Sequence, residues 1–115
     1  MRLQFFVPGI LVNPTNQRWH WTKRRAWAKQ WREAGAFLCR VTRGLHHPMW
    51  DPKSINFHCR VRRMFDTDNL AACCKPLRDG IADELGVSDG PKGGIVWTYT
   101  QIVDRKAPGV LVTVE

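Results

Sequence analysis

The stretch that decides the fold runs from Ser54 to Leu85 and reads SINFHCRVRRMFDTDNLAACCKPLRDGIADEL. Its first part, residues 54–62, alternates strictly between apolar and polar side chains. The apolar positions are Ile55, Phe57, Cys59 and Val61. A period of two is typical of a strand with one buried face. We therefore predict a strand over residues 54–62, followed by a short connection that contains Asp66 and Asp68.

The second part of this stretch changes to a helical period. The apolar residues that recur at helical spacing are Leu70, Cys74, Leu77, Ile81 and Leu85. This pattern predicts a helix over residues 69–85, with Gly86 as its C-terminal stop. Pro76 conflicts with the prediction, because it removes one backbone hydrogen bond and favours a kink.

The flanking sequence adds four more elements. We predict strands over residues 3–7, 95–103 and 109–114, and a long helix over residues 22–43. The order is then β-α-β-α-β-β. A chain of 115 residues rarely divides into two cores, so we expect residues 1–115 to form a single α+β domain.

The long helix is predicted to have two unlike faces. An apolar stripe would hold Trp27, Trp31, Ala34, Leu38 and Val41. The opposite side would hold Arg25, Lys29, Arg32, Arg40 and Arg43. We expect the stripe to be buried and the arginine-rich side to face solvent.

Charge is distributed unevenly along the chain, which has a net charge of +8. Residues 1–63 contain 13 Lys or Arg against two acids, and residues 64–115 contain five against eight. A basic half suits the binding of a polyanion, and an acidic half suits chemistry on it. The alternative is a generally basic, solvated surface.

Cysteine usage indicates a reducing compartment. Cys39, Cys59, Cys73 and Cys74 form no C-x-x-C pair, and their spacing matches no standard zinc motif. We see no signal peptide and no apolar stretch long enough to span a bilayer. The expectation is a cytoplasmic protein with free thiols and no membrane partner.

Asp66 and Asp68 are the first candidates for chemistry. In an extended segment residues i and i+2 point the same way, so both carboxylates can face one ion. Mg²⁺ takes oxygen ligands, often one or two carboxylates with phosphate and water. Phosphodiester hydrolysis uses that arrangement. The alternative is that the two aspartates only cap the following helix.

Further polar residues share one side of the predicted second helix. Asp68, Lys75 and Asp79 project opposite its apolar stripe. For Asp79 we favour the explanation that it is a surface partner of Lys75 at i, i+4. Asp89 lies in a Gly- and Pro-rich loop just beyond the helix end, where loops often carry functional groups.

These residues together resemble the RusA family of Holliday-junction resolvases, endonucleases of bacteria and their phages. The resemblance is carried by Asp66-Thr67-Asp68-Asn69-Leu70, Lys75-x-x-x-Asp79-Gly80 and Asp89, and more weakly by Pro14 and Asn16. It implies a homodimer with a mixed sheet that uses Mg²⁺, with Mn²⁺ as a substitute, to nick opposed strands of a four-way junction. The catalytic acids would be Asp66, Asp68 and Asp89, all three of them metal ligands, and the catalytic lysine would be Lys75.

The chain departs from that family's pattern at two positions. Lys75 comes seven residues after Asp68, where the best-studied pattern has four, so the lysine moves one helical turn along the same side. Ser88 stands where the family often has the first of two adjacent acids.

The sequence therefore predicts a metal-dependent endonuclease that resolves branched DNA. The residues expected to hold DNA are Arg24, Arg25, Lys29, Arg32, Arg60, Arg62 and Arg63. Trp19 and Trp21 could stack on exposed bases or pack inside the protein. The rival function is a non-catalytic nucleic-acid-binding protein with the same fold. Three carboxylates beside phosphate favour the nuclease, since a pure binder gains nothing from them.

Overall fold

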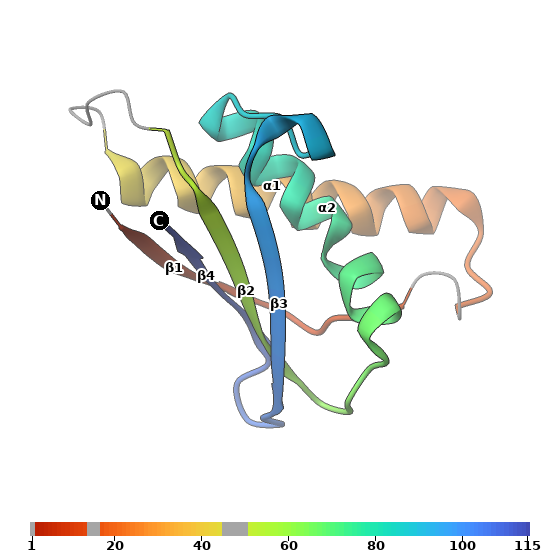
Figure 1. Ribbon diagram of the computed structural model, residues 1–115. Coiled ribbons are helices and arrows are strands. Elements are labelled where there is room, and N and C mark those ends of the chain that lie inside the picture. Colours follow the sequence, from red (N-terminus) through yellow and green to blue (C-terminus); the bar gives the residue numbers. More distant parts are fainter. Residues whose placement is uncertain (1, 14–16, 45–50) are drawn as a thin grey trace.

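The computed structural model describes residues 2–13, 17–44 and 51–115, which form one α+β domain (Figure 1). In chain order the elements are β1 (Leu3–Pro8), α1 (Trp21–Arg43), β2 (Ser54–Val61), α2 (Thr67–Leu85), a 3₁₀ helix (Pro91–Gly93), β3 (Val96–Val103) and β4 (Gly109–Val114). The predicted order of strands and helices is confirmed, and every predicted boundary lies within two residues of the observed one. The short 3₁₀ helix was not predicted.

The four strands form one mixed sheet in the order β1-β4-β2-β3. β4 pairs antiparallel with β1 and with β2, whereas β2 and β3 run parallel. The parallel pair follows from the connection, because α2 carries the chain back across the sheet between β2 and β3. β3 is therefore an edge strand that ends on the same side as β2.

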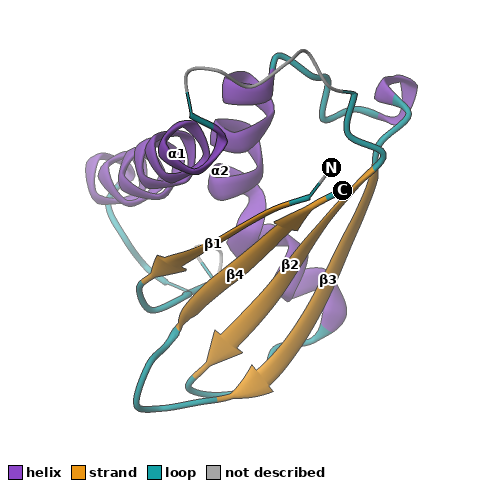
Figure 2. Ribbon diagram, turned by 90° about the vertical axis from the view of Figure 1, so that its left-hand side faces the viewer, coloured by secondary structure: helices purple, strands orange, loops and turns teal. Residues whose placement is uncertain are grey.

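Both helices cover the same face of the sheet (Figure 2). The alternation of β2 places Ile55, Phe57, Cys59 and Val61 in the core. Cys59 meets α2, since its sulfur lies 3.5 Å from the sulfur of Cys74. The prediction of free thiols is confirmed for all four cysteines, which are buried. Burial raises the pKa of the Cys39 thiol to about 11.

The buried face of α1 differs from the predicted stripe. Trp31, Gly35 and Cys39 are buried, while Val41 is 60% exposed and the prediction for it is wrong. Trp27, Ala34 and Leu38 are only partly buried against the core. The reason is the close approach of α2, which brings the Leu77 side chain onto Gly35.

A second glycine makes the same crossing possible. A Cβ atom at Gly80 would collide with the backbone carbonyl of Arg32 on α1. The two helices therefore touch backbone to backbone at this point. This contact sets Arg32 near the residues that follow Gly80 on α2.

The helix α2 runs through Pro76 without ending, and the proline is buried. It stops at Gly86, which has a left-handed conformation and donates its N–H to Ala82 and Asp83. The predicted C-terminal stop is thus confirmed. The sequence also predicts a loop at His46-His47-Pro48, and this segment lies outside the described residues. No helix in the described part of the chain is long and apolar enough to cross a membrane.

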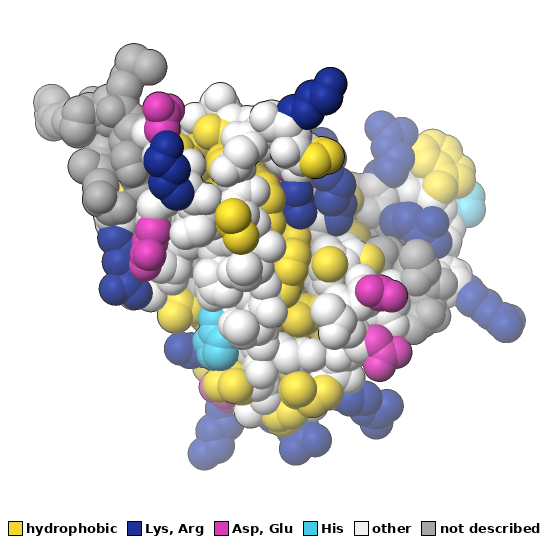
Figure 3. All heavy atoms as spheres, in the orientation of Figure 1, with side chains coloured by type: hydrophobic (Ala, Val, Ile, Leu, Met, Phe, Trp, Pro, Cys, Tyr) yellow, Lys and Arg dark blue, Asp and Glu magenta, His cyan; other side chains and the backbone are white. Residues whose placement is uncertain are grey.

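The other face of the sheet is open. Its polar side chains pair across strands, Gln4 with Thr113, Asn56 with Thr98, and His58 with Thr100. Arg60 is the one charged residue within the four strands. Figure 3 looks onto the β3 edge of the molecule and shows lysine and arginine side chains mainly around its outline. The strongly basic character of the chain is therefore not concentrated on the open sheet.

Candidate functional site

The start of α2 presents two carboxylates to solvent. Asp66 occupies the N-cap position with extended backbone, yet its side chain makes no capping hydrogen bond. Asp68 follows in the first helical turn, where a negative charge is favourable. Both residues are exposed, and neither carboxylate bonds to another residue within the described ranges. The capping explanation for Asp66 therefore lacks its hydrogen bond, and both groups are free to bind a ligand.

The backbone just before Asp66 is held in place from β3. The Gln101 side chain accepts the N–H of Phe65 at 3.0 Å and donates to its carbonyl at 2.8 Å. This double contact ties the β2–α2 connection to the sheet. Sequence reasoning missed Gln101, because no local pattern links it to a residue 36 positions earlier.

Lys75 lies between two carboxylates. Its ammonium donates to Asp79 Oδ1 at 2.8 Å and to Asp89 Oδ2 at 2.6 Å. The bonds to Asp79 and then Asp89 raise the pKa of Lys75. The bond from Lys75 is in turn the main reason that the pKa of Asp89 is lowered. The lysine is therefore protonated and Asp89 is ionised at neutral pH.

Arg78 completes this cluster and was also missed from the sequence. Its guanidinium donates to the backbone carbonyl of Asp89 and, at 3.1 Å, to the hydroxyl of Tyr99. It also packs over the Trp97 ring at 4.3 Å. These contacts fix the loop that carries Asp89 against β3.

The predicted metal ligands are only partly brought together. Asp66 and Asp68 sit at one end of α2, whereas Asp89 is engaged by Lys75. Among the described residues, no three His, Cys, Asp or Glu side chains gather as a metal-binding group. The donor chemistry still fits Mg²⁺, which often binds through one or two carboxylates and completes its shell with phosphate and water.

The predicted DNA-binding residues separate into three places. Those on α1 are Arg24, Arg25, Lys29 and Arg32, all of them exposed. Arg25 stacks on Trp21 at 5.4 Å, and Lys29 lies 3.8 Å from Glu33. Arg32 also lines a hollow of about 250 Å³ together with Asp79 and Asp89. The basic side of α1 therefore borders the group formed by Lys75, Arg78, Asp79 and Asp89, the Lys75 cluster.

The remaining arginines lie elsewhere. Arg60 projects on the open face of the sheet, where it covers the Phe6 ring at 5.0 Å. Arg60 therefore lies on a different surface from the basic residues of α1. Arg40 and Arg43 were expected on the open side of α1, but both bind Glu84 of α2, at 3.0 and 3.5 Å. They join the two helices instead.

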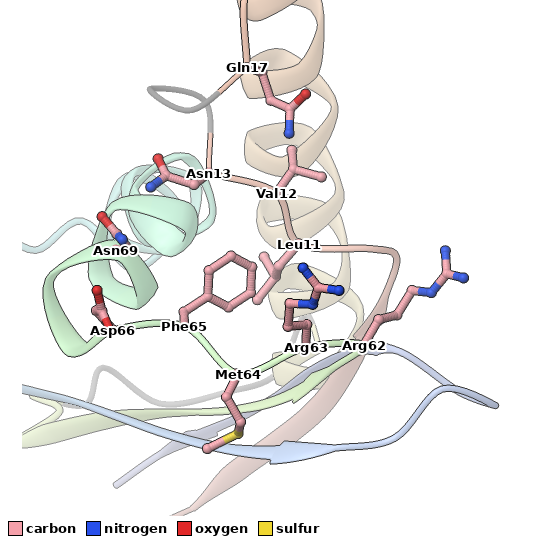
Figure 4. Close-up of a pocket in the computed structure, with 10 residues that line it drawn as sticks. All are labelled: Leu11, Val12, Asn13, Gln17, Arg62, Arg63, Met64, Phe65, Asp66 and Asn69. Atoms are coloured by element: carbon pink, nitrogen blue, oxygen red, sulfur yellow. The ribbon is translucent and has the colours of Figure 1, made fainter.

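A pocket of about 400 Å³ opens beside Asp66 (Figure 4). Its apolar wall includes Leu11, Val12, Met64 and Phe65. Its polar groups are Asn13, Gln17, Arg62, Arg63, Asp66 and Asn69. The pocket was not predicted, since it joins the segment after β1 to the start of α2. It brings Arg62 and Arg63 to the same site as Asp66.

The two tryptophans at the N-terminal end of α1 differ in their surroundings. Trp19 packs edge-on against Trp27 at 6.1 Å, with the Lys23 ammonium over its ring. Trp21 is 58% exposed. Trp19 is half-buried, so Trp21 is the more accessible of the two rings proposed for base stacking.

Comparison with known proteins identifies a bacterial relative. The chain is 39% identical over 82 residues to an uncharacterized protein of Xylella fastidiosa (strain Temecula1 / ATCC 700964). The match covers 64% of this chain and 51% of the relative, so the chain spans about half the length of the protein it matches. No family model matches the chain, and no solved structure matches it.

Proposed function

We propose that the protein is a Mg²⁺-dependent endonuclease that cuts Holliday junctions and related branched DNA in paired nicks, acting as a homodimer. The observation that carries the proposal is the pair of carboxylates at the start of α2, Asp66 and Asp68, which have no bonding partner in the part of the chain that the structure describes. They leave two oxygen donors open to a cation and its phosphate. A structural role would instead engage them in capping bonds or ion pairs.

In this proposal Asp66 and Asp68 hold Mg²⁺, or Mn²⁺ in its place. The bound ion would supply positive charge at the phosphate and lower the pKa of the attacking water. Asp89 is the third proposed ligand. Its carboxylate is held by Lys75 at 2.6 Å, so it would have to exchange that ammonium for the cation when DNA arrives.

Lys75 supplies a positive charge on the same helix. Seven residues separate it from Asp68, a rise of about 10 Å along the axis. A DNA strand following α2 would therefore meet the carboxylates first and the ammonium further along. The ammonium is well suited to contact the scissile phosphate or the next one, and to offset charge that develops in the transition state.

The exposed basic residues of α1 are proposed to hold a DNA arm. Arg32 is the link, because it lines the same hollow as Asp79 and Asp89. A polyanion bound along Arg25, Lys29 and Arg32 would be led toward the Lys75 cluster. Phosphate contacts of this kind position a nucleic acid without reading its sequence.

The alternative is a non-catalytic protein that binds nucleic acid. It is favoured by the ion pair between Lys75 and Asp89 and by the absence of a three-residue metal group among the described residues. The two functions differ in what the carboxylates do. A binder would hold DNA equally well or better after their neutralisation, and would cut nothing in either form.

The decisive experiment incubates the protein with a labelled four-way junction and with a linear duplex, in Mg²⁺ and in chelator. We expect paired nicks in the junction only, and only with the metal. Asp66→Asn and Asp68→Asn should abolish cutting while junction binding is kept or strengthened, because repulsion of phosphate is relieved. Asp51→Asn is the matched control, since Asp51 is exposed and precedes β2, at the opposite end of that strand from the β2–α2 connection. Intact junction in every condition would reject the nuclease.

A further inference from the structure

The pocket beside Asp66 has the composition of a site for a planar, partly polar ligand. Phe65 lies in its middle, facing Leu11, with Arg63 next to the ring (Figure 4). The amides of Asn13 and Asn69 lie together on one side, and Gln17 points in from another. An aromatic ring and a guanidinium offer stacking surfaces, and amides offer both donors and acceptors.

We propose that this pocket receives one unpaired nucleobase of the DNA strand whose phosphate meets Asp66. The inference rests on the proposed function, because that function supplies the strand. The base would lie against Phe65 and Leu11, and its edge would bond to the side-chain amides of Gln17 and Asn69. Arg62 and Arg63 would contact the phosphate attached to that nucleotide.

The size and shape of the pocket agree with this occupant. A volume of about 400 Å³ falls within the range of roughly 300–1,000 Å³ usual for small-molecule sites. A base inside a duplex cannot enter such a hollow, because it must first leave its stack. Bases at a branch point or in a single strand are already unstacked, or are unstacked at low cost.

The side chains of the pocket argue against a site for phosphate alone. An anion site requires cationic or N–H donors, and Arg62 and Arg63 would suffice for it. The aromatic and aliphatic wall formed by Phe65, Leu11 and Val12 would then be without purpose. The same wall is what a base needs, since stacking on an aromatic side chain is a major part of single-strand binding.

The floor of the pocket is fixed before any ligand binds. Gln101 holds both backbone polar groups of Phe65, so the ring is carried by an anchored backbone. A preformed site loses less conformational freedom on binding. The position of Asp66, one residue further, is coupled to the same anchor. Base recognition and cleavage would thus share one rigid segment.

The test measures binding without cleavage. Isotope-labelled protein in chelator is titrated with each of the four deoxynucleoside 5′-monophosphates and, separately, with deoxyribose 5-phosphate. We expect shifts of the side-chain amide signals of Gln17 and Asn69 and of the Phe65 backbone signal with at least one nucleotide. Deoxyribose 5-phosphate should leave those amides unshifted. Equal shifts with deoxyribose 5-phosphate would overturn the base assignment in favour of a phosphate site.

Two pocket variants separate the site from non-specific attraction. Gln17→Ala removes one amide and should weaken nucleotide binding roughly five- to tenfold, the effect of one net hydrogen bond. Val12→Phe fills the pocket while keeping every polar group, and should abolish the shifts. Gln4→Ala is the matched control, because Gln4 lies on the open sheet face and its side chain bonds to Thr113. Thermal unfolding confirms that each variant folds. Equal affinity in all three variants would overturn the proposal.

Failure of this inference differs from failure of the proposed function. A protein that binds mononucleotides in the pocket but leaves junctions intact would contradict only the nuclease. A protein that nicks junctions in Mg²⁺, with no nucleotide-dependent shift at Gln17 or Asn69, would contradict only the pocket. Junctions with a single abasic nucleotide, moved stepwise past the nick, give a further readout. In the parent protein, cleavage should slow when the abasic nucleotide stands at one particular position. In Val12→Phe, an abasic nucleotide at that position should not change the cleavage rate.

Discussion

The side-chain amide of Gln101 on β3 forms hydrogen bonds with both the backbone N–H and the backbone carbonyl of Phe65. Phe65 directly precedes Asp66, so an edge strand fixes the position of the backbone that carries the proposed metal ligand. The side-chain amide can form both bonds because its NH₂ group donates while its carbonyl oxygen accepts. The contact makes Gln101 a positioning residue.

Removing this contact should loosen the site more than the fold. Gln101→Ala loses two partly buried hydrogen bonds, and we expect the free energy of unfolding to fall by about 1–2 kcal/mol. Single-turnover cleavage should slow at least tenfold while KM for the junction changes little. Chemical denaturation and quenched-flow assays measure the two effects. Gln4→Ala, which loses one exposed bond to Thr113, should change neither; a cleavage rate equal to that of this control would remove Gln101 from the site.

Lys75 is expected to act on the transition state. Lys75→Ala should lower the single-turnover rate by on the order of a hundredfold, as loss of a charge-stabilising donor does. Lys75→Arg should rescue only part of it, because a planar fork replaces a point charge. Lys53→Ala, an exposed lysine before β2, is the control. A near-normal rate in Lys75→Ala would leave the lysine as a surface partner of Asp79 and Asp89.

The protonation state of Lys75 adds a pH signature to that experiment. Its pKa is raised by the bonds to Asp79 and Asp89, so the ammonium is present below that pKa and lost only above it. Through neutral and mildly alkaline pH, the cleavage rate of the parent protein should therefore not fall relative to that of Lys75→Arg. Such a fall, abolished by the arginine, would show a lysine that deprotonates in the working range.

Affinity for DNA should depend steeply on salt. Each phosphate contact contributes a slope of about −0.9 in log K against log salt for duplex DNA. Arg25→Ala and Arg32→Ala should each flatten the slope by about that amount. Arg2→Ala, whose guanidinium pairs with Glu115, serves as the control and should leave the slope unchanged. Binding that does not vary with salt would refute the electrostatic attraction.

The oligomeric state follows from the reaction. Paired nicks on a two-fold symmetric junction call for two active sites, and symmetric dimers are the commonest oligomers. Sedimentation at micromolar concentration should give about twice the 13.3 kDa mass of the chain. A mass of one chain, both free and with junction bound, would contradict paired cutting by a homodimer.

The crossing of the two helices should tolerate no added methyl group. Gly80→Ala would push a Cβ into the Arg32 carbonyl, and we expect a loss of about 1–3 kcal/mol despite the better helix propensity of alanine. Gly90→Ala is the control, since its Cβ would meet only ordinary contact with Ser88. Equal unfolding midpoints for the two variants would show that the helices can separate without loss.

Local patterns in the sequence were enough for the elements themselves. The alternation of Ile55, Phe57 and Cys59 determined β2 and its buried face, because a strand turns each successive side chain to the opposite side. The helical spacing from Leu70 to Leu85 determined α2, and packing carried the helix through Pro76. Lys75 and Asp79 were placed on one helix side by the same geometry.

Only the tertiary structure decided what those elements bring together. Glycines at positions 35 and 80 let α1 and α2 touch, which buried Cys39 in place of Val41 and turned Arg40 and Arg43 toward Glu84. Gln101 bonds to Phe65, and Asn13 and Asn69 line one pocket, although these residues lie far apart in the chain. Periodicity records which side of an element is apolar. Periodicity does not show which distant element packs against that side, because this depends on how closely the two backbones can approach.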